Sequence, residues 1–145
     1  HAMQNVWDLV DPVVKAHHLV RDPIHGVPTK HVFMPAGIID GYFSPRAEAA
    51  LAVHLGAPLV GEEVEPFLPA SLRLAGLEAT TYPVQNNLNG KTAAVLEYAS
   101  ENIKGHYVLF NQEGARHQYT CFLASVGSPG GARLSAPGAL NDPCP

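Results

Sequence analysis

The segment from residue 31 to residue 56 constrains the fold most, because it reads as a complete strand–loop–helix unit. Residues 31–34 form a short apolar run, which predicts a buried strand that ends at Pro35. Ser44 follows a loop and predicts a helix N-cap, with the helix running to about Leu55. A strand followed by a helix is the building block of α/β folds. We therefore expect an α/β fold.

A second unit of the same kind lies further along the chain. Residues 92–98 predict a buried strand, residues 104–106 a short loop, and residues 112–125 a closing helix with Asn111 as its cap. Only two or three strands are recognisable in total, whereas α/β sheets average about five or six. The chain therefore reads as one edge of a larger, open α/β sheet.

The remaining segments carry weaker signals. We expect residues 1–145 to form a single unit, with a short helix over Pro12–Val20. Residues 57–90 are rich in proline and predict an irregular insertion, with one candidate strand at 78–84. Residues 127–145 are mostly Gly, Pro, Ser and Ala, and this composition predicts an extended surface tail that buries little.

Charge and hydropathy exclude two classes of partner. The net charge is −4, and the nine Lys and Arg residues do not cluster, so we expect no nucleic-acid partner and no anionic membrane surface. The longest apolar run, Val32–Ile39, is far shorter than the roughly 18 residues of a membrane span. The chain starts His1-Ala2-Met3, which suggests a tag remnant or an internal fragment boundary and gives no information about a signal peptide.

Two polar residues follow the two predicted strands. Asp40 comes after the first strand and His106 lies in a glycine-flanked loop after the second, and open α/β sheets collect their reactive groups at these strand ends. A histidine suits proton transfer near neutral pH, and a buried carboxylate can orient it. Plainer interpretations stay open, because Asp40 can be a turn former and His106 a hydrogen-bonded structural residue.

The two cysteines lie far apart in the sequence. The last predicted helix has an apolar stripe, and at 100° per residue Cys121 falls beside that stripe, toward solvent. An exposed thiol and a loose tail that ends near Cys144 suggest a disulfide, which would contribute about 3 kcal/mol and imply an oxidising, secreted or periplasmic compartment. Two unrelated thiols are the alternative. The stripe consists of Ala115, Tyr119, Phe122, Leu123 and Val126.

Other residue patterns predict no further site. Four early histidines match no standard zinc spacing, and no cysteine lies near them, so we expect no metal site. We expect His54 near a helix end and His117 on a polar, solvated helix face, both without a function. No glycine-rich phosphate loop is present, so we expect no cofactor. The four early histidines are His17, His18, His25 and His31.

No serine in the sequence stands in the G-x-S-x-G frame of the α/β-hydrolase nucleophile elbow. If Asp40 and His106 belong to a Ser-His-Asp triad, the serine must lie upstream and outside this chain. The serines are Ser44, Ser71, Ser100, Ser125, Ser128 and Ser135.

The two units resemble α/β-hydrolases. Residues 30–45, KHVFMPAGIIDGYFSP, are similar to the segment that carries the catalytic acid of that family, and residues 105–110, GHYVLF, are similar to its histidine loop. The similarity points to the C-terminal end of bacterial, secreted lipase- or esterase-like enzymes, and it covers about 60 of the 145 residues. The order, acid before histidine, is that of the family.

This resemblance implies roles for two residues. Asp40 would orient the imidazole of His106, which would serve as general base for the serine and then as general acid for the leaving alcohol. The nucleophile and the oxyanion hole would come from the N-terminal part of the hydrolase, as another chain or a missing segment. The substrate would be a small ester or lipid. Residues 57–90 exceed what a compact hydrolase needs, and could shape a pocket or pack on a neighbouring domain.

Two alternatives belong to other classes. The chain could be a small non-catalytic binding or structural module, in which Asp40 and His106 are structural. It could also be a stand-alone enzyme with Cys121 as nucleophile, although a mid-helix cysteine lacks the usual activation. The hydrolase hypothesis predicts the Asp40 carboxylate within hydrogen-bond reach of a His106 ring nitrogen, whereas the binding-module hypothesis predicts no such contact.

Overall fold

A pair of parallel strands lies at the centre of the fold. The computed structural model describes residues 7–8, 10–100 and 104–145. Strand β1 (Val32–Gly37) pairs in parallel with β3 (Ala93–Tyr98), in a register that joins Val32 to Ala93 and Gly37 to Tyr98. Because the strands are parallel, their carboxyl ends lie at the same end of the sheet. The predicted mixture of helices and strands is confirmed.

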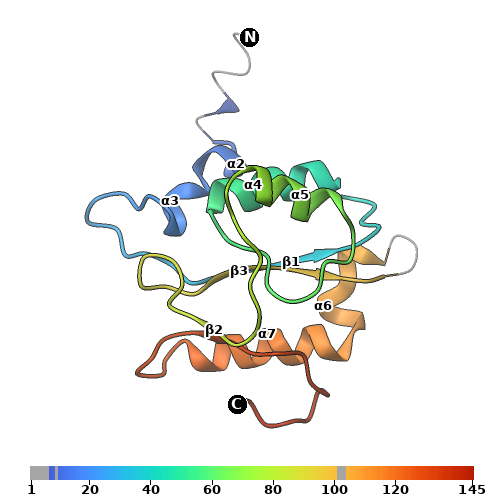
Figure 1. The fold of residues 1–145 in the computed structure, drawn as a ribbon. Helices are drawn as coiled ribbons and strands as arrows, with labels where there is room; N and C mark the ends of the chain where they lie inside the picture. The colour runs from blue at the N-terminus through green and yellow to red at the C-terminus, as the bar shows by residue number, and fades with distance from the viewer. Residues whose placement is uncertain (1–6, 9, 101–103) are drawn as a thin grey trace.

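Helices cover both faces of this sheet (Figure 1). Helices α4 (Pro45–Leu55) and α5 (Phe67–Leu74) lie on one face, and α7 (Glu113–Ser125) lies on the other. A second two-stranded sheet pairs β2 and β4 in antiparallel fashion. The short elements are α2 (Pro12–Lys15), α3 (His17–Val20), β2 (Val84–Gln85), the 3₁₀ helix η1 (Gly105–Tyr107), α6 (Val108–Asn111) and β4 (Arg133–Leu134).

Each face of the central sheet has its own apolar core. On one face, Val95 of β3 packs with Leu55 of α4 and Leu72 of α5. On the other face, Leu96 packs with Phe122 of α7 and with Leu134 of the tail. All six residues of β3 are buried, as expected for a strand covered on both faces.

Strand β1 is longer than its sequence predicts. Pro35 lies inside the strand instead of ending it, and the strand ends at Gly37. The amide of Val32 donates to Thr92, just before β3, and the amide of Ile38 donates to Tyr98, so the backbone amides of the even-numbered residues of β1 point toward β3. The nitrogen of Pro35 therefore points to the opposite edge, where no ladder partner is required of it.

The two edges of the central sheet differ. Beyond β3, the amide of Val60 donates to Val95 at 2.9 Å, and the amide of Val95 donates to Pro58 at 2.9 Å. On the other side, β1 has no further strand beside it among the described residues. The central sheet is thus closed on the β3 side and open on the β1 side.

The segment 57–90 is more ordered than its composition predicts. It contains α5, which packs on α4, and its first residues extend the sheet beside β3. The candidate strand at 78–84 is reduced to a single bridge between Val60 and Thr80, and β2 begins only at Val84. Pro69 lies within α5, where the chain was expected to be irregular.

A disulfide joins Cys121 to Cys144, as the sequence suggested, but the orientation of α7 differs from the prediction. Cys121 is buried instead of facing solvent, because the tail packs over this side of the helix. His117 is also buried, at 5% exposure, instead of solvated. Of the predicted stripe, Ala115 and Phe122 are buried, whereas the other three residues are 41–50% exposed. Helix α7 begins after Gln112 as its N-cap, in place of Asn111.

The tail also buries more than its composition predicts. Ala132 and Leu134 are fully buried, and β4 places Leu134 opposite Val84 of β2. The segment His1–Met3 lies outside the described residues. In the part of the chain that the structure describes, no helix has the length and hydropathy needed to cross a bilayer.

Candidate active site

Asp40 lies at the carboxyl end of β1, in a turn that its own side chain closes. Its Oδ1 accepts hydrogen bonds from the amides of Tyr42 at 2.6 Å and Phe43 at 3.1 Å. Such a turn closed by an aspartate side chain fixes the orientation of the carboxylate. The preceding Ile39 has a φ of 61°, a conformation that few β-branched residues adopt. Oδ2 is left to face away from the turn.

His106 is placed by a close approach of two backbones. A Cβ on Gly37 would overlap the backbone of Gly105, and a Cβ on Gly105 would lie 2.6 Å from the carbonyl oxygen of Gly37. Glycine at both positions therefore lets η1 lie against the end of β1. His106, the next residue, then projects toward the Asp40 turn.

The two side chains meet in a hydrogen bond. The Nδ1 of His106 lies 3.0 Å from the Oδ2 of Asp40. Burial alone would raise the pKa of Asp40, but the hydrogen bonds from Tyr42, Phe43 and His106 outweigh this effect and hold the pKa below its ordinary value. The carboxylate is thus ionised near neutral pH and accepts a proton-bearing Nδ1. The contact expected from the sequence is present.

This bond fixes the chemistry of the other ring nitrogen. With Nδ1 donating to the carboxylate, the Nε2 of a neutral His106 carries a lone pair and can accept a proton. The His106 side chain is 32% exposed, so its ring is open to a reacting group. Its ring lies 4.4 Å from the ring of Tyr42 and 5.8 Å from that of Phe43, measured between centroids. These aromatic contacts restrict rotation of the imidazole.

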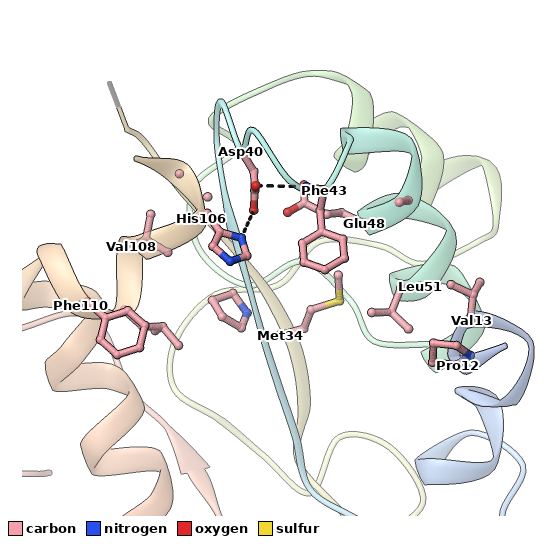
Figure 2. A pocket seen from close by; sticks show the side chains of 15 residues that line it. Pro12, Val13, Met34, Asp40, Phe43, Glu48, Leu51, His106, Val108 and Phe110 are labelled. Atoms are coloured by element: carbon pink, nitrogen blue, oxygen red, sulfur yellow. Dashed lines mark hydrogen bonds and ion pairs between the residues drawn. The ribbon is translucent and has the colours of Figure 1, made fainter. Parts of the chain in front are cut away.

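An apolar hollow of about 360 Å³ lies beside the imidazole. Figure 2 shows Met34 and Leu51 on one side of it and Phe110 on the other, with His106 and Asp40 at one end. The hollow follows the open edge of β1, because Met34, Pro35 and Gly37 all line it. At its far end lie Pro12 and Val13 of α2.

Glu48 is a site residue that the sequence did not indicate. It lies in the first turn of α4 and lines the hollow beside Asp40. Burial, and then the nearby carboxylates of Asp40, Glu65 and Glu97, raise its pKa to about 7. In the sequence, a glutamate in this position indicates only a favourable contact with the helix dipole. Its proximity to Asp40 depends on the fold of the loop between β1 and α4.

Among the described residues, no serine and no free cysteine lines the hollow beside this pair. Ser44 accepts a hydrogen bond as the N-cap of α4, and the hydroxyl of Ser100 donates to Ile38. Both cysteines are in the disulfide, so the hypothesis of a Cys121 nucleophile is wrong. The pair is equipped for proton transfer to or from a group bound beside it.

The structure separates some of the early histidines and gathers others. His31 accepts a hydrogen bond from Thr92 beside the sheet, and burial lowers its pKa. His25 is exposed in a loop. His17 and His18, however, lie close to Asp22, a grouping that sequence spacing did not predict.

Comparison with known proteins adds no relative. No protein-family model, no curated protein and no solved structure matches this chain.

Proposed function

We propose that this chain is the acid-and-histidine part of a serine hydrolase that acts on carboxylic esters or lipids. The observation that carries the proposal is the hydrogen bond between His106 Nδ1 and Asp40 Oδ2, at the carboxyl ends of two adjacent parallel strands. An acid and a histidine in this order and place are the second and third members of the α/β-hydrolase triad. The nucleophilic serine lies outside the 145 residues.

The role of each side chain follows from its bonds. His106 Nε2 takes the proton of the serine hydroxyl as the serine attacks the ester carbonyl, and later returns a proton to the leaving alcohol. Asp40 stabilises the imidazolium that forms between these steps, and its two amide hydrogen bonds keep it ionised. The hydrogen-bond donors of the oxyanion hole come from the same N-terminal part of the hydrolase as the serine.

The open edge of β1 supports the N-terminal part of the hydrolase as the partner of this chain. That part would be another chain or a missing segment. The hollow runs along this edge and is lined by apolar residues from the helices on both sides. Exposed aromatic side chains continue on both sides of it, with Phe43 at 56% exposure and Phe110 at 74%. Surfaces of this kind mark interaction sites. A further strand beside β1 would extend the sheet and complete the pocket wall.

The substrate class and the compartment have separate support. The hollow is apolar and of a size that suits a small ligand, which favours an acyl chain or apolar alcohol. The disulfide favours an oxidising compartment, such as the bacterial periplasm or the extracellular space.

The proposal is tested by ester hydrolysis with the native particle. The particle is recovered through an affinity tag on this chain and assayed with p-nitrophenyl esters of increasing acyl length. We expect hydrolysis that is lost in His106→Ala and retained in His54→Ala, a control on the exposed end of α4. Equal rates for wild type and His106→Ala would refute the proposal. The isolated 145-residue chain is expected to be inactive.

A further inference from the structure

A cluster of three potential metal ligands lies at helix α3 and just after it. It consists of His17, His18 and Asp22. One metal-ligating atom of each residue lies within 4.8 Å of those of the other two. Adjacent residues on a regular helix point about 100° apart. Here α3 is a single turn that begins at His17, and the two imidazole rings lie 3.8 Å apart between centroids. The side-chain conformations of the two histidines therefore bring their rings together despite this angle.

Both imidazoles are oriented by the backbone. The Nδ1 of His17 lies 2.9 Å from the carbonyl oxygen of Val14, and the Nδ1 of His18 lies 2.8 Å from that of Asp22. A carbonyl oxygen only accepts, so each Nδ1 carries the proton and each Nε2 keeps its lone pair. Metal-binding histidines characteristically donate their second ring nitrogen in this way. The arrangement is that of two ligands with their tautomers already set.

The third member is fixed by the same turn. The amide of Asp22 donates to the carbonyl of His17 at 2.8 Å, which holds the end of α3 closed. The carboxylate of Asp22 is free to add an oxygen ligand, because no hydrogen bond or ion pair of its side chain occurs among the described residues. Two imidazole nitrogens and one carboxylate oxygen thus come from a six-residue stretch.

We infer that His17, His18 and Asp22 bind a divalent transition metal ion of the zinc class. Imidazole nitrogens suit Zn²⁺, whereas Ca²⁺ and Mg²⁺ prefer sets made only of oxygen. Three protein ligands leave one position of a tetrahedral ion to water, which agrees with the partial exposure of the cluster. No thiolate competes for the ion, because both cysteines are in the disulfide.

The metal site would stabilise a segment that is already hydrogen-bonded to the rest of the fold. Arg21 donates to the carbonyl of Val53 on α4 at 3.1 Å, and Asn89 donates to the carbonyl of Val20 at 2.8 Å. Helix α2 precedes the cluster and contributes Val13 to the wall of the apolar hollow. A bound ion would therefore stabilise the wall of that hollow without touching Asp40 or His106. The inference stands whether or not the chain is part of a hydrolase.

Metal titration of the full 145-residue chain tests this inference. Isothermal titration with ZnCl₂ is expected to show one ion per chain, and thermal unfolding is expected to shift to higher temperature with ZnCl₂ but not with CaCl₂ or MgCl₂. His18→Gln and Asp22→Ala should each weaken binding by about ten-fold or more. His25→Gln is the matched control, since it changes an exposed histidine three residues beyond Asp22, and it should bind as wild type does.

Two further measurements keep the test independent of folding defects. Circular dichroism and thermal unfolding in EDTA show whether each variant is folded before zinc is added. In the wild type, zinc should shift the Nε2 resonances of His17 and His18 in ¹⁵N spectra and leave those of His106 unchanged. Absence of binding by the wild type overturns the inference. So does equal binding by wild type and His18→Gln, or loss of binding in His25→Gln.

Discussion

Asp40 divides its two carboxylate oxygens between two tasks. Oδ1 closes the turn after β1 by accepting from the amides of Tyr42 and Phe43, and Oδ2 accepts from His106. A backbone feature and a candidate catalytic contact thus depend on one side chain. A substitution that keeps the first task and removes the second isolates the contact with His106.

Asp40→Asn is such a substitution. The amide oxygen of Asn can still close the turn, but its NH₂ group would face Nδ1–H of His106, so the imidazole must change tautomer or rotate. We expect ¹⁵N spectra of wild type to show His106 protonated at Nδ1, and those of the variant to show the proton at Nε2. The free energy of unfolding should fall by about 1 kcal/mol.

The matched control for that variant is Asp142→Asn. Asp142 also accepts from a backbone amide, that of Ala139, but it lies in the exposed tail. The control should leave the His106 tautomer unchanged. An Nδ1-protonated His106 in Asp40→Asn would contradict the assignment of the contact.

Glu48 gives the stability of the chain an unusual dependence on pH. Its pKa is about 7 in the folded chain and near 4.5 when unfolded, so between these values the folded state holds a proton that the unfolded state has lost. Stability from this group is therefore complete below about pH 4.5 and is lost as the pH rises through 7. Asp40 acts in the opposite sense, because its pKa is lowered and its contribution is lost only on acidification.

Glu48→Gln should remove this loss of stability between about pH 4.5 and pH 7. Urea unfolding is expected to show equal stability of variant and wild type at pH 5, and a variant more stable by on the order of 1 kcal/mol at pH 8, after allowance for partial solvent screening. Glu78→Gln, at an exposed position, is the control and should be neutral at both pH values. A Glu48→Gln variant that is less stable than wild type at pH 8 would show that the ionised carboxylate is favourable.

At the scale of elements, the site depends on the contact between the end of β1 and η1. Gly105→Ala would place a Cβ 2.6 Å from the carbonyl oxygen of Gly37 and 2.8 Å from the amide of Asp40. These are backbone atoms and cannot rotate away, so we expect a loss of about 1–3 kcal/mol in urea unfolding. The ¹⁵N signals of His106 should also move. Gly127→Ala, where a Cβ meets nothing within 4 Å, should be neutral.

The disulfide fastens the tail to α7. It joins residues 23 apart in the sequence, and a loop of this size contributes about 3 kcal/mol. We expect the double variant Cys121→Ala/Cys144→Ala to lose about that much in urea unfolding, and its tail to be cut faster by proteases. If the double variant unfolds at the same urea concentration as wild type, the packing of Ala132 and Leu134 alone holds the tail.

The elements differ in how far the sequence could predict them. Helix α4 has an N-cap, a proline at its start and a glycine after its end, and its bounds follow from these local signals. The orientation of α7 does not follow, because it depends on where the tail packs. The tail packs over the helix and buries Cys121 and His117. The pattern of apolar residues within the helix does not indicate this burial.

The site shows the same division. Asp40 and His106 could be identified because each follows a strand, and adjacent parallel strands bring such residues together. Glu48 could not, since its proximity to Asp40 comes from the path of a loop. The His17–His18–Asp22 cluster was missed because only the histidine spacing and nearby cysteines were considered, whereas the third member of the cluster is an aspartate.

At the scale of the whole molecule, the sheet is asymmetric. The β3 edge is covered by the segment at Leu59 and Val60, whereas the β1 edge is open and is lined by an apolar hollow. Pro35 removes one donor from this edge, so an added parallel strand would bond there with one gap in its ladder. The described part has the candidate acid–histidine pair and the open edge, but no serine lines the hollow beside them.

We propose that the serine served by His106 comes from outside this chain. The most direct test labels the native particle with a fluorophosphonate and maps the modified peptide by mass spectrometry. We expect a labelled serine in a polypeptide segment that is not part of the 145 residues, and loss of labelling in His106→Ala. A particle that consists of this chain alone and takes no label would contradict the claim, as would a label on a serine within the chain.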